Sequence, residues 1–236
     1  MPLFPASFVI SGWGSRCVSP CENRGRGGAG KERARGFDIL NPCITTRKGA
    51  NVHTLHPDIE SVLISEEQLH DCAVQMGRDI TRDYAEKTGG LVVISVLRGA
   101  AIFMADLVRE IHLPLEMDYM AISSYGSSTQ SSGVIKVLKD ITSDIQGKHV
   151  IIAEDIIDSG LTLGYTIEHL KKYGPASVEV ASLLRKERDG QADVPARYVG
   201  FTIPDAFVVG YGLDYAERFR NLSYLGILKP QVYGGV

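Results

Sequence analysis

The chain has 236 residues, of which 44% are hydrophobic and 22% are charged, and its formal net charge is -3 at pH 7. This composition is ordinary for a globular protein that buries a core, and a negative net charge offers nucleic acid no electrostatic attraction. Every apolar run falls short of the ~20 residues that a membrane-spanning helix needs, so we expect no membrane partner.

Residues 1–50 form a basic segment that differs from the rest of the chain. They carry eight Lys/Arg against three Asp/Glu, whereas the remaining residues carry 17 against 25. Residues 14–36 are rich in Gly, Arg and Ser without helical or strand periodicity, which is typical of a disordered segment. The sequence RGRGG resembles arms that bind nucleic acid, but a single short copy is weak support. We predict a disordered N-terminal extension over 1–50, a folded domain over 51–236 and no nucleic-acid partner.

The N-terminus and the cysteines bear on the compartment. The first residues lack a basic region ahead of their apolar stretch, so a secretory signal is not indicated. Three of the four cysteines fall in the basic segment, and Cys72 stands alone in the body of the chain. This distribution is neither a disulfide framework nor a strong metal motif. We therefore expect a protein of the reducing cytoplasm.

Strand and helix patterns alternate from about residue 56 onward. Continuous apolar runs such as LVVISVL predict strands buried on both faces. Alternation of strands with helices predicts an α/β fold with a parallel sheet covered on both faces, and ligands bind beyond the carboxyl ends of such strands. The expected elements are strand 61–65, a helix from Ser65 to about Lys87, strand 91–97, helix 100–111, strands 115–123, 134–140 and 149–155, helix 161–173, strand 178–184, and short strands near 198–201, 207–210 and 224–228.

The most informative junction is HVIIAEDIIDSGLTL, at residues 149–163. A buried strand is expected to end in Glu154 and Asp155, and Asp158 follows at the entry to a helix. The free N–H groups of a first helical turn, with the Ser159 and Thr162 hydroxyls, suit a phosphate dianion. Carboxylates beside a phosphate pocket require a cation or sugar hydroxyls between them, and Mg2+ and ribose supply these. The alternative is that Asp158 or Ser159 only caps the helix, which leaves the carboxylate pair unexplained.

This segment resembles the phosphoribosyl-pyrophosphate motif of type I phosphoribosyltransferases, and the pair Ile156-Ile157 with the surrounding text resembles the hypoxanthine-guanine branch. The resemblance covers about residues 56–233 and none of residues 1–50. It implies a mostly parallel twisted sheet flanked by helices, with a small hood subdomain. It also implies Mg2+-dependent transfer of a phosphoribosyl group from phosphoribosyl pyrophosphate to hypoxanthine and/or guanine, which yields IMP or GMP and pyrophosphate. Homologous enzymes form dimers or tetramers, so a homo-oligomer is expected.

The resemblance also assigns roles to individual residues. Arg98 and Gly99 match the pyrophosphate loop, which follows a Leu across a cis peptide and carries Lys in many family members where this chain has Arg98. Ser124 and Tyr125 match a serine-rich mobile lid over 123–133. Asp158 matches the general base. The motif that holds the ribose 5-phosphate corresponds to Ile156, Ser159, Gly160, Leu161 and Thr162, and the magnesium ligands to Glu154, Asp155 and Asp214.

The base and the leaving group have their own matches. Lys186 aligns with a lysine that donates to the purine 6-oxo oxygen, which argues against adenine because its 6-amino group is itself a donor. Phe207 and Val208 match residues that stack on the base and bind it through the backbone, and Arg220 matches a pyrophosphate ligand. Interpreted without the family, Arg98 fits a solvated surface residue and Phe207 a core residue.

Two other functions are compatible with parts of this pattern. One is a transferase for another base such as xanthine, and the residues do not discriminate between hypoxanthine, guanine and xanthine. The other is a regulator that keeps the phosphoribosyl-pyrophosphate site to sense nucleotides and binds RNA or DNA. Asp158, Lys186, Phe207 and the lid together exceed what sensing needs, and residues 51–236 carry an excess of acidic residues. We therefore favour the transferase.

Overall fold

The computed structural model describes residues 55–124, 135–187 and 194–234, all within the unit Val52–Val236. The predictions for residues 1–50, for Tyr125 and for the remainder of the serine-rich lid lie outside the described residues. In the described part, helices and strands follow the alternation expected from the sequence.

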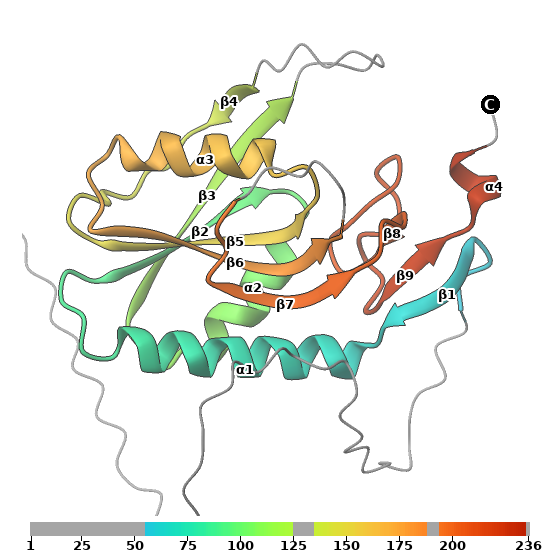
Figure 1. The fold of residues 1–236 in the computed structure, drawn as a ribbon, viewed down its shortest axis with the longest axis horizontal. Coiled ribbons are helices and arrows are strands. Elements are labelled where there is room, and N and C mark those ends of the chain that lie inside the picture. Colours follow the sequence, from blue (N-terminus) through green and yellow to red (C-terminus); the bar gives the residue numbers. More distant parts are fainter. Residues whose placement is uncertain (1–54, 125–134, 188–193, 235–236) are drawn as a thin grey trace, which may run out of the picture. The chain divides into compact units, whose positions relative to one another are not determined.

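A six-stranded sheet with the order β4-β3-β2-β5-β6-β7 forms the centre of the described part of the chain (Figure 1). β3, β2, β5, β6 and β7 are parallel, and β4 pairs antiparallel with β3. This arrangement confirms the predicted mostly parallel sheet. The strands are β2 (Leu91–Leu97), β3 (Leu115–Ser124), β4 (Ile135–Lys139), β5 (His149–Ile157), β6 (Ser177–Lys186) and β7 (Tyr198–Ile203).

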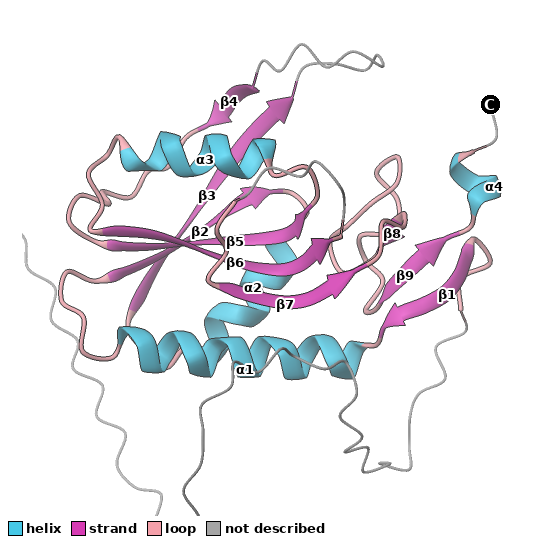
Figure 2. Cartoon of the chain, viewed as in Figure 1, coloured by secondary structure: helices cyan, strands magenta, loops and turns pink. Residues whose placement is uncertain are grey.

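Helices cover both faces of this sheet, as the apolar strands require. Figure 2 shows α1 (Glu66–Tyr84) and α2 (Ala101–Glu110) on one face and α3 (Leu161–Lys171) on the other. Neighbouring residues of a strand therefore point into different hydrophobic cores. Val93 packs with residues of α1 and α2, whereas Val92 packs with residues of α3. α1 begins with a capping box, in which Ser65 Oγ accepts from the N–H of Gln68 and the Gln68 side chain accepts from the N–H of Ser65.

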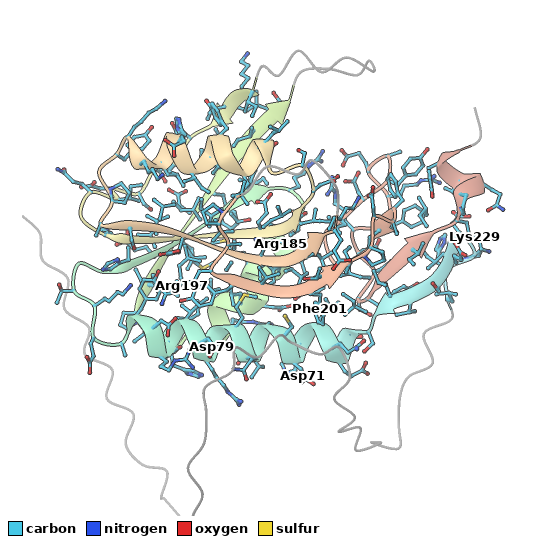
Figure 3. The ribbon with its side chains drawn as sticks, in the orientation of Figure 1. Asp71, Asp79, Arg185, Arg197, Phe201 and Lys229 are labelled. Atoms are coloured by element: carbon cyan, nitrogen blue, oxygen red, sulfur yellow. The ribbon has the colours of Figure 1, made fainter. Side chains whose placement is uncertain are left out.

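A second sheet joins the two ends of the described chain. It has the order β1-β9-β8 and is antiparallel, and it corresponds to the predicted hood. Its small core includes Ile59, Phe219 and Leu228. Lys229, labelled in Figure 3, donates from Nζ to the carbonyl of Pro57 at 2.6 Å, which ties this C-terminal end to the start of the sheet. The elements are β1 (Ile59–Ile64), β8 (Val208–Val209), β9 (Leu225–Leu228) and α4 (Pro230–Tyr233).

Several element boundaries differ from the predictions. β5 runs on to Ile157, so the two acidic residues expected at its end lie inside the strand. The reason is that pairing with β6 continues, with Ile156 opposite Leu184 and Ile157 opposite Arg185. α1 ends at Tyr84, and α4 was not predicted. None of the described helices combines the length and apolar character of a membrane span.

Asp118 anchors β3 to the loop that precedes β5. Its side chain is buried and accepts from the backbone N–H groups of Tyr119, Thr142 and Ser143 at 2.7, 2.6 and 2.8 Å. Burial alone would raise the pKa of Asp118, but the N–H groups of Ser143 and Thr142 outweigh it and hold the pKa well below its usual range. The ionised carboxylate is therefore a structural acceptor for these three N–H groups.

We expect Asp118→Ala to lower the free energy of unfolding by ~2–4 kcal/mol at neutral pH, because it removes the buried acceptor of three backbone N–H groups. Since the folded pKa is lowered, this stabilisation is present above the unfolded pKa of ~4 and is lost as the pH falls towards the folded value. The difference between wild type and variant should thus shrink in acid. Urea unfolding at several pH values measures it. Glu116→Ala, an exposed change on the same strand, should cost ~0.5 kcal/mol or less.

Candidate active site

The carboxyl ends of the parallel strands meet the hood. Figure 1 shows the arrowheads of β5, β6 and β7 on the side of the sheet where β8 lies. Three loops come together there: the turn after β2, the connection from β5 to α3, and the segment 210–222 between β8 and β9. Most of the residues predicted for binding or catalysis lie on these loops or on the last residues of the strands that precede them.

The turn after β2 packs closely against its surroundings on two sides. A side chain at Gly99 would overlap the carboxylate of Asp155 on β5, and a side chain at Gly212, where φ is +103°, would overlap the carbonyl oxygen of Gly99. Glycine at both positions lets this turn pack directly against β5 and against the 210–222 segment. The Leu97–Arg98 peptide is cis, as the resemblance implies.

The two adjacent carboxylates on β5 lie in a crowded, partly buried environment. Burial, followed by the negative charge of Asp155, raises the pKa of Glu154 well above its usual value. Burial raises the pKa of Asp155 to about 6, and the nearby carboxylate of Asp214 adds to the rise. The N–H of Ile156, which donates to Asp155 Oδ1 at 2.8 Å, and the Arg220 guanidinium act in the opposite direction. Negative charge is thus in excess at this end of β5.

Arg220 is the basic residue at the centre of the 210–222 segment. Its Nη2 lies 2.7 Å from Asp214 Oδ1, and its Nη1 donates to the carbonyl of Gly212 at 2.7 Å. Arg220 Nε is buried and has no hydrogen-bond partner among the described residues. Arg98 comes close to the same cluster, because its Nη2 lies 2.6 Å from Glu217 Oε1. The predicted pyrophosphate ligands and the predicted metal ligands therefore share one charge network.

Lys186 and Asp158 form a second group. Lys186, the last residue of β6, places Nζ 3.6 Å from Asp158 Oδ2 and 3.3 Å from Asp205 Oδ1. Its neighbour Arg185, labelled in Figure 3, instead donates to the carbonyl of Val194 at 3.3 Å. Asp205 is a residue that the sequence analysis missed. The available signal was an acidic residue in the loop after β7, two positions before Phe207.

The helix entry differs from the capping alternative. The N-cap of α3 is Gly160, with φ at +79°, and this residue has no side chain to cap the helix. Asp158 lies two residues earlier and faces Lys186. Ser159 Oγ makes a long 3.4 Å contact with the N–H of Leu161. Leu161 is exposed, whereas Thr162 and Ile156 are partly buried.

Phe207 is exposed rather than part of the core, which excludes the core interpretation. Its ring stacks on Tyr233 with centroids 4.8 Å apart and meets the edge of Tyr215 at 5.5 Å. Val208 is buried in β8. Ser124 is the last residue of β3, and Tyr125 lies outside the described residues.

A magnesium ion fits the acidic groups in one particular mode. Among the described residues there is no cluster of three or more acidic, His or Cys side chains with metal-binding geometry. Mg2+, however, is usually held by one or two carboxylates together with substrate phosphates and water. The pKa values of Glu154 and Asp155 are raised because burial and neighbouring carboxylates disfavour their charged forms, and a nearby cation would stabilise those charged forms. The donor set therefore suits an ion that arrives with its phosphorylated substrate.

Comparison with known proteins identifies the family. The family model of the phosphoribosyl transferase domain matches residues 66–216, so the chain contains a phosphoribosyltransferase domain. The chain is 53% identical to the hypoxanthine-guanine phosphoribosyltransferase of Mycobacterium avium over 203 residues, 84% of this chain and 98% of that protein. It is 51% identical to the Bacillus subtilis protein of the same name over 176 residues, 75% of this chain and 97% of that protein. The chain belongs to the hypoxanthine-guanine phosphoribosyltransferase family.

Solved structures are similar as well. A crystal structure of a hypoxanthine phosphoribosyltransferase from Staphylococcus aureus superposes with a TM-score of 0.72 at 42% identity. The match covers 78% of this chain and 99% of that chain. The predicted fold class is thereby confirmed.

Asp155 provides a test of the charge excess. Because its folded pKa is raised to about 6, its contribution to stability is present below the unfolded pKa of ~4 and is lost as the pH rises through about 6. Asp155→Asn removes the buried charge and keeps an acceptor oxygen for Ile156. We expect it to stabilise the protein by ~1–3 kcal/mol near pH 8 and to have little effect near pH 4.

Thermal and urea unfolding at the two pH values measure this difference. Asp71→Asn, a change on the exposed face of α1 (Figure 3), is the matched control and should alter stability equally little at both. An equal gain for Asp155→Asn at pH 4 and pH 8 would contradict the assignment.

Proposed function

We propose that this chain transfers the 5-phosphoribosyl group of phosphoribosyl pyrophosphate to hypoxanthine and/or guanine, in purine salvage. The observation that carries the proposal is the pairing of Lys186 with Asp158, because it sets a cationic donor and a carboxylate side by side next to the start of α3. A 6-oxopurine needs the cationic donor at its 6-oxo oxygen and the carboxylate near its imidazole ring. The names of the related proteins support the same substrates.

The donor substrate would bind across the three loops. The 5-phosphate takes the N–H groups at the start of α3 with the Ser159 and Thr162 hydroxyls, and Glu154 and Asp155 face the ribose hydroxyls. The pyrophosphate group lies at Gly99, with Arg98 and Arg220 as its cations. Bound Mg2+ would be held by Asp155, Glu154 and Asp214 and would neutralise charge on the pyrophosphate.

The base would enter between Phe207 and Lys186. N9 of the purine attacks C1 of the ribose, the C1–oxygen bond breaks, and its electron pair leaves with pyrophosphate. Asp158 takes the N7 proton as the N9–C1 bond forms. The charge on the departing pyrophosphate is stabilised by the two guanidinium groups. Ser124 and Tyr125 are proposed to belong to a lid that excludes water from the oxocarbenium-like transition state.

The competing functions are less well supported. A nucleotide-sensing regulator would need neither a proton acceptor nor a 6-oxo donor, yet Asp158 and Lys186 lie 3.6 Å apart. A cytoplasmic location and assembly into a dimer or tetramer are proposals that rest on the family resemblance. Light scattering of the purified protein tests the assembly.

The substrate assignment is tested with hypoxanthine, guanine, xanthine and adenine as acceptors and pyrophosphate release as the signal. We expect turnover with 6-oxopurines and little with adenine. Lys186→Ala should raise the KM for hypoxanthine by ~10- to 100-fold, because a charged hydrogen bond is worth ~1.5–3 kcal/mol, and leave the KM for phosphoribosyl pyrophosphate nearly unchanged. Arg185→Ala, its neighbour on β6, is the control. Equal losses for both substrates would show that Lys186 does not contact the base.

The proton-transfer step is tested by Asp158→Asn. The amide cannot accept the N7 proton, so kcat should fall by ~10²–10⁴, whereas binding of phosphoribosyl pyrophosphate should change only a few-fold. Asp205→Asn is a matched control, since Asp205 also lies beside Lys186 Nζ but is not the proposed base. We expect its kcat to stay within a few-fold of wild type. Steady-state rates across pH, with thermal melts, separate the two roles, and near-normal turnover of Asp158→Asn would sink the general-base assignment.

A further inference from the structure

Glu217 stands between the two cations proposed to bind pyrophosphate. Its Oε1 lies 2.6 Å from Nη2 of Arg98, and its Oε2 lies 3.5 Å from Nη2 of Arg220. These arginines come from loops far apart in the sequence, and one carboxylate reaches both. Carboxylate and phosphate oxygens are alternative partners for the same guanidinium donors.

The backbone holds Glu217 in this position. The N–H of Glu217 donates to Asp214 Oδ2 at 2.9 Å. Ala216, Glu217 and Phe219 have φ values of 49°, 63° and 77°, a region that residues other than glycine seldom occupy. A chain that adopts several such conformations in succession is fixed by its surroundings. The approach of Glu217 to the arginines is therefore a property of the loop and not of a free surface side chain.

The two arginines differ in how firmly their own loops hold them. Besides its contact with Glu217, Arg220 binds Asp214 and the carbonyl of Gly212, and these contacts anchor its guanidinium within its own loop. Arg98 is exposed, with 67% of its side-chain area accessible. Glu217 thus neutralises the more exposed cation and places negative charge where a pyrophosphate oxygen would approach.

We propose that Glu217 sets the affinity of the pyrophosphate subsite, by acting as an internal carboxylate that the pyrophosphate group must displace from Arg98 and Arg220. The inference rests on the proposed function and extends it to this residue. Displacement weakens pyrophosphate binding, and return of the carboxylate to the arginines favours release of the product.

The displaced side chain has space to occupy. A cavity of about 490 Å3 adjoins this segment and is lined by residues 217–222 and by His56. Glu217 is itself 60% accessible, so it can leave the arginines without disturbing the core. Because exposed ion pairs are weak, we expect a change in affinity of about 3- to 10-fold rather than an all-or-none effect.

The test is isothermal titration of the full-length protein with pyrophosphate in the presence of Mg2+. Glu217→Gln keeps the length of the side chain and removes its charge, and we expect its Kd to be about 3- to 10-fold lower than that of wild type. Glu168→Gln, which removes the same charge from an exposed ion pair with Lys171 on α3, should leave Kd unchanged. An unchanged or higher Kd for Glu217→Gln overturns the proposal.

Two further variants test whether the change in Kd comes from the contact between Glu217 and Arg98. Glu217→Asp keeps the charge but shortens the reach towards Arg98, so it should also lower Kd, by less than the Gln variant. In an Arg98→Ala background the fold-decrease in Kd caused by Glu217→Gln should shrink by at least half. An undiminished decrease in Kd in that background would show that Glu217 does not act through Arg98 and would overturn the proposal.

The outcome is distinguishable from failure of the proposed function. Pyrophosphate binding is measured without a purine base, so a protein that transfers no base but shows the expected order of Kd values supports the role of Glu217 and refutes the transferase. Normal transfer with equal Kd values for wild type and Glu217→Gln supports the transferase and refutes the role of Glu217. Lack of pyrophosphate binding by the wild type refutes both.

Discussion

The packing of Gly99 between Asp155 and Gly212 is the constraint on which the site depends. It brings the turn after β2 into direct contact with the end of β5 on one side and with the 210–222 segment on the other. A methyl group at Gly212 would overlap the backbone of Gly99, and one at Gly99 would displace the carboxylate of Asp155. The relative position of the loops that carry Arg98 and Arg220 therefore depends on the backbone contact between Gly99 and Gly212.

Charge balance is the second organising feature. Lys186 is matched by Asp158 and Asp205, and Arg98 is matched by Glu217. The cations that we propose to bind substrate are thus partnered by the protein's own carboxylates, which avoids leaving them uncompensated. Substrate binding on this view exchanges one set of ion pairs for another, so net affinity depends on the difference between the two sets.

The hood contributes through both ends of the described chain. β1 pairs with β9, and the N–H of Lys229 donates to the carbonyl of Asp58. Phe207 directly precedes β8 and contacts Tyr233 and Tyr215. The small sheet therefore carries Phe207 and, between β8 and β9, Asp214 and Arg220, whereas Glu154, Asp155 and Lys186 lie on strands of the large sheet.

The sequence by itself determined the parallel sheet and the helices on both faces, because buried strands and helices have local patterns. The segment 154–162 indicated a site for phosphate and Mg2+, and the roles of Lys186, Phe207 and Arg220 came from the family resemblance. It placed the end of β5 too early, since charged residues such as Glu154 rarely lie inside a buried strand, and strand pairing with β6 was invisible. Only the tertiary structure decided that Asp158 faces Lys186 and that Glu217 reaches Arg98, 119 positions away. Contacts between loops distant in the chain depend on how the strands that carry them are packed, and local periodicity holds no information about that.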